Sequence, residues 1–188
     1  MIGCNGEAGT LVNSFALVSY LPQPLGGFLD SLRNELVSEC RAKAHLTVLP
    51  PRPLDCASQD AWYQLLDTLQ DFQPFRVKLG EIQIFPVTQV IYLSITEGYH
   101  ELLRLHAALN AGRVSFQEPF EFHPHVTLAQ DLDQDRVVAA VELAAGRWHA
   151  FLQSRTYIVD RLTFVQNTLG NRWKDLCSVP LTSGVPAR

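Results

Sequence analysis

AHLTVLPP at residues 44–51 and FHPHVTLAQ at residues 122–130 share the pattern His-aliphatic-Thr-aliphatic, and this shared pattern decides the fold. Side chains alternate between the two faces of a strand, so His45 and Thr47 share one face while their aliphatic neighbours occupy the other. The same alternation holds for the second stretch. Each stretch therefore predicts a half-buried strand that presents one imidazole and one hydroxyl on its polar face.

The segments around these two stretches follow the same order of expected elements. The first half reads as a strand at 15–21, a helix at 25–40, the strand at 45–49, a helix starting at Ser58 and a strand at 75–85. The second half reads as a strand at 90–95, a helix at 99–109, the strand at 125–128, a helix capped by Asp133 and ending at Gly146, and a strand at 157–165. A last strand at 173–181 would pair back as a hairpin. The matching order predicts a duplication.

Each half is too small to bury both faces of its own sheet, so the halves are expected to pack together around a cleft. We expect one domain over residues 1–188, with pseudo-repeat lobes at roughly 14–86 and 90–181, and a closing hairpin that can cross between them. A pseudo-twofold axis puts equivalent residues opposite each other. The first His/Thr pair is then expected to face His125 and Thr127 across the cleft.

Two imidazoles and two hydroxyls that converge on one point suit the chemistry of a phosphodiester. One histidine can act as general base and the other as general acid, while the threonines donate to the non-bridging oxygens. Protonated imidazole itself supplies positive charge, so this chemistry needs no metal. The alternative is that each Thr serves only the β propensity of its strand and each His is a partly buried structural ring.

The composition is that of a globular protein, with 47% hydrophobic residues, 18% charged residues and a mean hydropathy of +0.03. A formal net charge of −4 excludes the basic stripe of a protein that coats duplex DNA. No apolar run approaches the ~20 residues of a membrane span, and residues 1–10 lack the pattern of a signal peptide. We therefore expect a cytoplasmic monomer with no membrane partner.

Reduced thiols are expected at Cys4, Cys40, Cys56 and Cys177.

The two His-containing stretches resemble the twin signatures of the two-histidine (2H) phosphoesterase superfamily. The resemblance is to its 2′-5′ RNA ligase-like branch, which includes bacterial RNA 2′,3′-cyclic phosphodiesterases. FALVSYLP at 15–22 and LTFVQNTLGNRWKDLCSVPL at 162–181 extend it over most of the chain. It implies a bilobal, duplicated α+β fold, with two antiparallel sheets lining a central cleft and helices packed outside. It also implies that His45 and His125 are catalytic and that Thr47 and Thr127 bind phosphate.

The resemblance and the residues together predict a metal-independent phosphodiesterase without a cofactor. Its expected reaction opens 2′,3′-cyclic phosphate on RNA ends or small nucleotides, and the reverse reaction would be 2′-5′ RNA ligation. The alternative is a non-catalytic nucleotide- or RNA-binding module that uses the same cleft. A metal-dependent hydrolase would need a set of ligands that the sequence does not display.

Three further residues are candidates for contact with substrate or for support of the site: Arg52, His123 and Gln130. Relatives of the RNA phosphodiesterase type commonly carry a basic residue where this sequence has Gln130, and an amide supplies no charge to a polyanionic chain. Arg52 is a candidate local cation or, alternatively, a solvated loop charge. His123 is a candidate supporting residue, and a metal pair of His123 with His125 is the less favoured interpretation. The remaining aromatic candidates are expected outside the site: His100, His106, His149, Trp62, Trp148 and Trp173.

Overall fold

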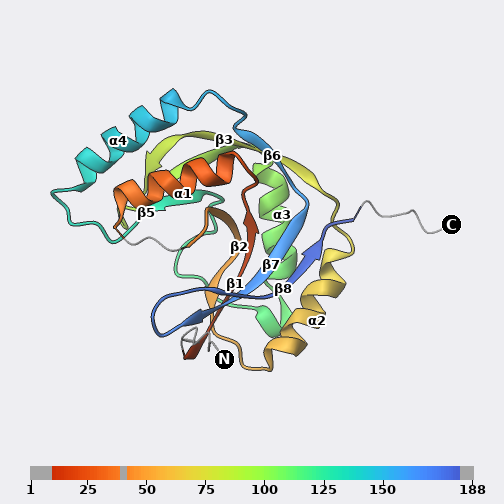
Figure 1. Ribbon diagram of the computed structural model, residues 1–188. Coiled ribbons are helices and arrows are strands. Elements are labelled where there is room, and N and C mark those ends of the chain that lie inside the picture. The colour runs from red at the N-terminus through yellow and green to blue at the C-terminus, as the bar shows by residue number, and fades with distance from the viewer. Residues whose placement is uncertain (1–9, 39–41, 183–188) are drawn as a thin grey trace, which may run out of the picture.

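The computed structural model describes residues 10–38 and 42–182, which form an α+β fold of two sheets with helices packed against them (Figure 1). The strands are β1 (Leu11–Tyr20), β2 (His45–Arg52), β3 (Phe75–Ile84), β4 (Ile91–Glu97), β5 (Val126–Ala129), β6 (Thr156–Val159), β7 (Arg161–Thr168) and β8 (Lys174–Pro180). The helices are α1 (Leu25–Leu36), α2 (Ser58–Leu69), α3 (Tyr99–Leu109), the 3-10 helix η1 (Gly112–Val114) and α4 (Val137–Ala150). The expected fold class is confirmed.

Both sheets have four strands, and all their pairings are antiparallel. Sheet A has the order β2-β1-β7-β8, and sheet B has the order β5-β4-β3-β6. The two H-x-T strands, β2 and β5, therefore occupy equivalent edge positions. The third strand of each half crosses over, because β3 joins sheet B and β7 joins sheet A. The repeats seen in the sequence thus interlock rather than forming one sheet each.

The crossing between sheets occurs at Asp160, inside the segment that the sequence predicted as one strand. β6 pairs with β3 in sheet B, whereas β7 pairs with β1 and β8 in sheet A. The Asp160 carbonyl accepts a hydrogen bond from the Leu181 amide at 2.7 Å. Side-chain periodicity continues through the segment, so the sequence pattern does not reveal the change of sheet.

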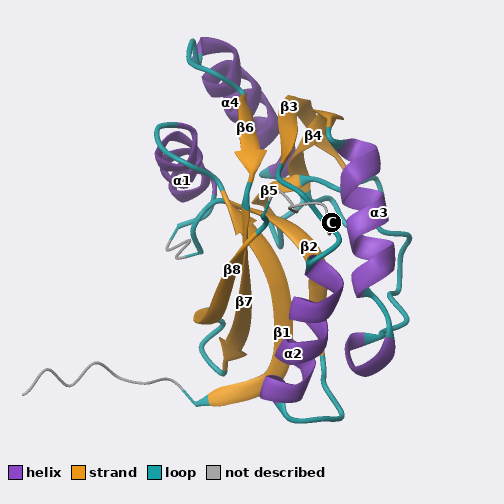
Figure 2. Ribbon diagram, turned by 90° about the vertical axis from the view of Figure 1, so that its right-hand side faces the viewer, coloured by secondary structure: helices purple, strands orange, loops and turns teal. Residues whose placement is uncertain are grey.

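The helices cover the sheets in two pairs (Figure 2). α2 and α3 contact each other, and α3 packs on β2 of sheet A. α1 and α4 contact each other and pack on β5 and β3 of sheet B. The predicted apolar stripes are the buried faces, as in α1, where Leu25, Leu29, Leu32 and Leu36 are at most 3% exposed. Each fully buried Leu contributes about 1.5–3 kcal/mol to this packing.

Several element boundaries differ from the sequence prediction. α1 ends at Leu36, and Cys40 lies outside the described residues, as does Cys4. α4 begins at Val137 instead of directly after Asp133, because a turn closed by the Arg136 amide on the Asp133 carbonyl comes first. Cys56 and Cys177 are free thiols. Within the part of the chain that the structure describes, no helix has the length and hydropathy to cross a membrane.

The core joins the two sheets and fixes the orientation of both H-x-T strands. Leu46, Val48, Val126 and Leu128 are at most 1% exposed and belong to one apolar cluster. The alternating polar residues His45, Thr47, His125 and Thr127 remain partly exposed. The alternation predicted from the sequence is therefore confirmed, and the polar faces of β2 and β5 are turned away from the core.

Candidate active site

A cleft of about 1780 Å³ receives the polar faces of both H-x-T strands. His45, Thr47, His125 and Thr127 all line it, together with residues of β1, β7, β8 and the loop before β5. Pockets for drug-sized ligands measure about 300–1,000 Å³, so this cleft has room for more than a mononucleotide. The structure brings together the four residues that the sequence paired.

Both histidines are anchored in the same way. His45 Nδ1 lies 2.7 Å from the carbonyl oxygen of Lys43, and His125 Nδ1 lies 2.6 Å from the carbonyl oxygen of His123. A carbonyl can only accept, so each Nδ1 carries the hydrogen and donates it. In the neutral ring, Nε2 then keeps its lone pair and can take a proton.

Two charged side chains of α1 hold the segment that leads into His45. The Asp30 carboxylate accepts the Ala44 amide hydrogen at 2.5 Å, and Arg33 donates to the Lys43 carbonyl at 3.1 Å. That carbonyl is also the acceptor for the His45 ring. Arg33 is 7% exposed and lines the cleft. α1 therefore fixes the backbone that orients this imidazole.

Aromatic rings surround His125. Its centroid lies 5.1 Å from that of Phe85 and 5.3 Å from that of Tyr92, with the Phe85 ring nearly perpendicular at 84°. Phe85 and Tyr92 stack on each other at 4.1 Å. His123 contacts the same two rings at 5.3 and 5.7 Å. These edge-to-face contacts restrict the orientation of His125 and withdraw it from water.

Burial favours the uncharged form of both imidazoles. It lowers the pKa of His45 from 6.5 to about 4, and the Arg33 charge acts in the same direction while the hydrogen bond to the Lys43 carbonyl opposes it. Burial also lowers the pKa of His125, against the hydrogen bond to the His123 carbonyl. Without a ligand, both rings are therefore neutral near pH 7.

Sheet A forms a basic and aromatic wall of the cleft that the sequence analysis missed. The Tyr20 hydroxyl donates to the Asp175 carboxylate at 2.5 Å, and burial together with this carboxylate raises the pKa of Tyr20. Lys43 lies over the Tyr20 ring, 5.4 Å from its centroid. The β7–β8 hairpin adds Arg172, Trp173 and Lys174. Tyr20 pairs with His45 between β1 and β2, and this pairing would have placed Tyr20 at the site. It can be used only when the register of the two strands is known.

Trp173 corrects an expectation from the sequence, which placed no tryptophan in the site. It lines the cleft and packs with Val18 and Val165 on the inner face of sheet A. Trp62 and Trp148 belong to the core, as expected. Across the cleft, the lining includes exposed apolar side chains, among them Val87 at 80% and Phe120 at 61% exposure.

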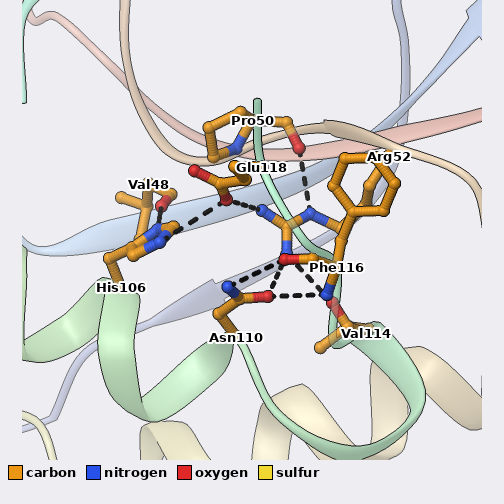
Figure 3. Close-up of polar contacts among 8 residues, drawn as sticks. All are labelled: Val48, Pro50, Arg52, His106, Asn110, Val114, Phe116 and Glu118. Atoms are coloured by element: carbon orange, nitrogen blue, oxygen red, sulfur yellow. Dashed lines mark hydrogen bonds and ion pairs between the residues drawn. The ribbon is translucent and has the colours of Figure 1, made fainter. Parts of the chain in front are cut away.

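The three supporting candidates occupy different places. His123 lines the cleft and supplies the carbonyl that orients His125. Gln130 also lines the cleft, and its amide donates to the Asp131 carboxylate at 3.1 Å. Arg52 does not line the cleft: it ends β2, is 3% exposed and is buried in an ion pair with Glu118 (Figure 3). It is therefore neither a cation of the cleft nor a solvated loop charge.

The rings of His123 and His125 lie with their centroids 6.4 Å apart. Over residues 10–38 and 42–182, no three His, Cys, Asp or Glu side chains come close enough together to hold a metal ion. His106 is buried, while His100 and His149 are exposed and do not line the cleft.

The family model described as the 2′-5′ RNA ligase superfamily matches residues 21–171. The chain belongs to this superfamily. The matched region contains both H-x-T strands, the helices α1 to α4 and the turn that follows β7. The resemblance inferred from the two motifs is confirmed.

Individual relatives are more distant. A protein of Oceanobacillus iheyensis that is named as a candidate phosphoesterase is 33% identical over 73 residues, which are 38% of this chain and 42% of that protein. The aligned part thus spans about two fifths of that curated relative. A crystal structure of a phosphoesterase superposes with a TM-score of 0.63 at 19% identity, covering 91% of this chain and 99% of the other. E. coli LigT in complex with NADP+ gives a TM-score of 0.61 at 18% identity, covering 93% and 100%. These superpositions establish the shared fold.

Proposed function

We propose that the protein is a phosphodiesterase that opens 2′,3′-cyclic phosphates by general acid–base catalysis with His45 and His125. The observation that carries this proposal is the twin anchoring of the two rings, each with Nδ1–H on the carbonyl two residues before it, in one cleft. Anchored rings present Nε2 with a defined tautomer, which a proton-transfer pair requires.

In the proposed reaction, the neutral ring of one histidine takes a proton from a water molecule through Nε2. The water oxygen forms a bond to phosphorus, and the bond from phosphorus to one ribose oxygen breaks in line with it. The second histidine, protonated, gives its proton to that leaving oxygen. The product is a ribose with one free hydroxyl and one phosphomonoester. The same sequence with the 5′-hydroxyl of a second ribose in place of water, and with the 3′ oxygen as the leaving group, would form a 2′-5′ linkage.

The threonines serve the oxygens that do not react. His45 begins β2 and His125 directly precedes β5, and Thr47 and Thr127 follow them by two residues and line the same cleft. Their hydroxyls can donate to the non-bridging oxygens, on which negative charge builds up in the transition state. A preorganised donor of this kind is worth about 2.7–4 kcal/mol in the best-studied enzymes.

Family membership and the structural neighbours support a nucleotide substrate. The superfamily is named for RNA ligation, and E. coli LigT has also been solved with 3′-AMP, with ATP and with phosphate. The basic side chains Lys43, Arg172 and Lys174 and the apolar side chains Val87 and Phe120 all line the cleft, which suits a ligand with both phosphates and bases. The cleft has room for an RNA end as well as for a free mononucleotide.

Product analysis tests the proposal directly. The purified protein is incubated with each nucleoside 2′,3′-cyclic phosphate and with an oligoribonucleotide that ends in a 2′,3′-cyclic phosphate, and the products are separated by chromatography. We expect ring opening that His45→Ala and His125→Ala remove. Binding of the oligonucleotide by calorimetry without any ring opening would refute catalysis and favour the non-catalytic binding module.

A further inference from the structure

At the end of β2, a largely buried network surrounds Arg52 (Figure 3), and two of its members, Phe116 and Glu118, also line the cleft. Its guanidinium donates to the Pro50 carbonyl at 3.0 Å, to the Asn110 side-chain oxygen at 2.7 Å and to the Val114 carbonyl at 2.9 Å. It also forms an ion pair with Glu118 at 2.5 Å. One side chain at the end of an H-x-T strand therefore contacts the residue that follows α3, η1 and the loop that leads to the other H-x-T strand.

The ion pair is deeply buried, with side-chain exposures of 2% for Arg52 and 10% for Glu118. Burying two charges costs several kcal/mol per ion, and well-packed apolar residues at such positions are often equally stabilising. Fold stability alone thus gives little reason for charges here. A guanidinium with several fixed donors does, however, define the geometry of the groups around it more closely than apolar contacts do.

His106 extends the network toward both motifs. Its Nδ1 lies 2.8 Å from the Val48 carbonyl, one residue after Thr47, and its Nε2 lies 3.4 Å from the Glu118 carboxylate. Its ring stacks on Phe122 with centroids 3.8 Å apart and planes 8° from parallel. α3 thereby connects the backbone of β2 to the loop in front of β5.

The loop held in this way determines the orientation of His125. Residues 115–125 have no regular secondary structure. Asn110 fixes the start of the loop through two hydrogen bonds with the Phe116 backbone. Near its end, Phe122 directly precedes His123, whose carbonyl accepts the His125 Nδ1 hydrogen at 2.6 Å. A shift of Phe122 would move this carbonyl and, with it, the imidazole.

From these contacts we infer that Arg52, Glu118 and His106 are positioning residues. They fix the two H-x-T motifs relative to each other and orient His125 for catalysis. The inference rests on the proposed function. Glu118→Ala is expected to lower kcat about 10- to 100-fold with less than about a 3-fold change in KM, since small displacements of a reacting group cost rates of this size. Glu118→Gln keeps an oxygen that accepts from Arg52 and is expected to recover most of the rate.

Glu35→Ala is the matched control, because it makes the same change in the exposed Arg147–Glu35 pair at 2.9 Å. It should leave kcat and KM unchanged. The decisive second measurement is an NMR titration of the imidazole protons, which needs no turnover. In Glu118→Ala, the His125 resonance and its titration should shift toward those of a solvated histidine, whereas the His45 resonance should stay within its wild-type range.

A folded Glu118→Ala protein with wild-type kcat and an unchanged His125 titration would overturn the inference. Equal shifts at His45 and His125 would also overturn it, since they indicate general loosening. If Glu118→Ala does not fold, Phe122→Leu takes its place, because it removes the stack on His106 and leaves the ion pair. An unchanged His125 titration in that variant would then contradict the inference. Absence of ring opening in the wild-type protein would refute the proposed function alone, because the NMR titrations still decide the positioning role.

Discussion

Burial of both imidazoles predicts that kcat/KM reaches its maximum at acidic pH. The competent free protein carries one proton on the histidine pair, so kcat/KM falls on either side of the two pKa values of that pair. Histidines with ordinary pKa values near 6.5 would give an optimum around neutrality. Here burial lowers the pKa of His45 to about 4 and lowers that of His125 as well. We therefore expect the optimum of kcat/KM below about pH 6.

The size of the effect follows from these values. A change from 6.5 to about 4 for His45 corresponds to about 3 kcal/mol in favour of the neutral ring. An anionic phosphodiester about 4 Å from a ring contributes about 4 kcal/mol in the opposite direction at an effective dielectric constant of about 20. The bound substrate therefore raises the pKa values of the two histidines, and the pair takes up a proton from solvent on binding. The kcat profile, which reports the complex, should have its optimum at least about one pH unit above that of kcat/KM.

Initial rates on a cyclic-phosphate substrate between about pH 4 and pH 9, at constant ionic strength, separate the two profiles. Folding must be followed at each pH. Because the lowered pKa of His45 makes the unfolded chain bind more protons between about pH 4 and 6.5, stability falls as pH falls through that window. A kcat/KM optimum at or above about pH 7, in protein that stays folded throughout, would show that the two rings are not desolvated as the structure indicates.

Three further predictions concern the groups in the cleft. His45→Ala and His125→Ala should each nearly abolish turnover in folded protein, and steady-state rates of the double variant should be little lower, because the pair acts as one unit. Thr47→Ala and Thr127→Ala should each slow turnover by about 10- to 1,000-fold, and wild-type rates in both would place the hydroxyls outside the reaction. Turnover should survive dialysis against EDTA, and loss with recovery on adding a divalent ion would contradict the two-histidine mechanism.

The sequence predicted the local features of the site well, because strand alternation alone determines them. His45 and Thr47 alternate with buried Leu46 and Val48, and this pattern needs no tertiary information. The equivalence of the two motifs likewise followed from the order of elements. A cleft shared by the two strands could therefore be expected from the amino-acid sequence alone.

Features that depend on tertiary partners could not be predicted. Arg52 follows two prolines in the sequence, where a solvated charge is the usual outcome, and its burial depends on Glu118, which comes much later in the chain. Trp173 directly precedes β8 and lines the cleft because it packs against Val18 and Val165, which are distant from it or on another strand. The pKa values of His45 and His125 are lowered by burial among residues from several elements, which no local sequence pattern predicts. Each of these outcomes depends on contacts between residues distant in sequence.

The exchange of strands between the halves explains how two edge strands can hold a rigid site. From the first half of the chain, β3 is a strand of sheet B and α1 packs on that sheet. From the second half, β7 is a strand of sheet A and α3 packs on that sheet. Moving the sheets apart would therefore expose a core that contains Leu46 of β2 and Val126 of β5. Such a cleft cannot open freely, so the imidazoles and hydroxyls keep their relative positions before a ligand arrives. Preorganisation of this kind avoids the cost of reorienting the catalytic groups during the reaction.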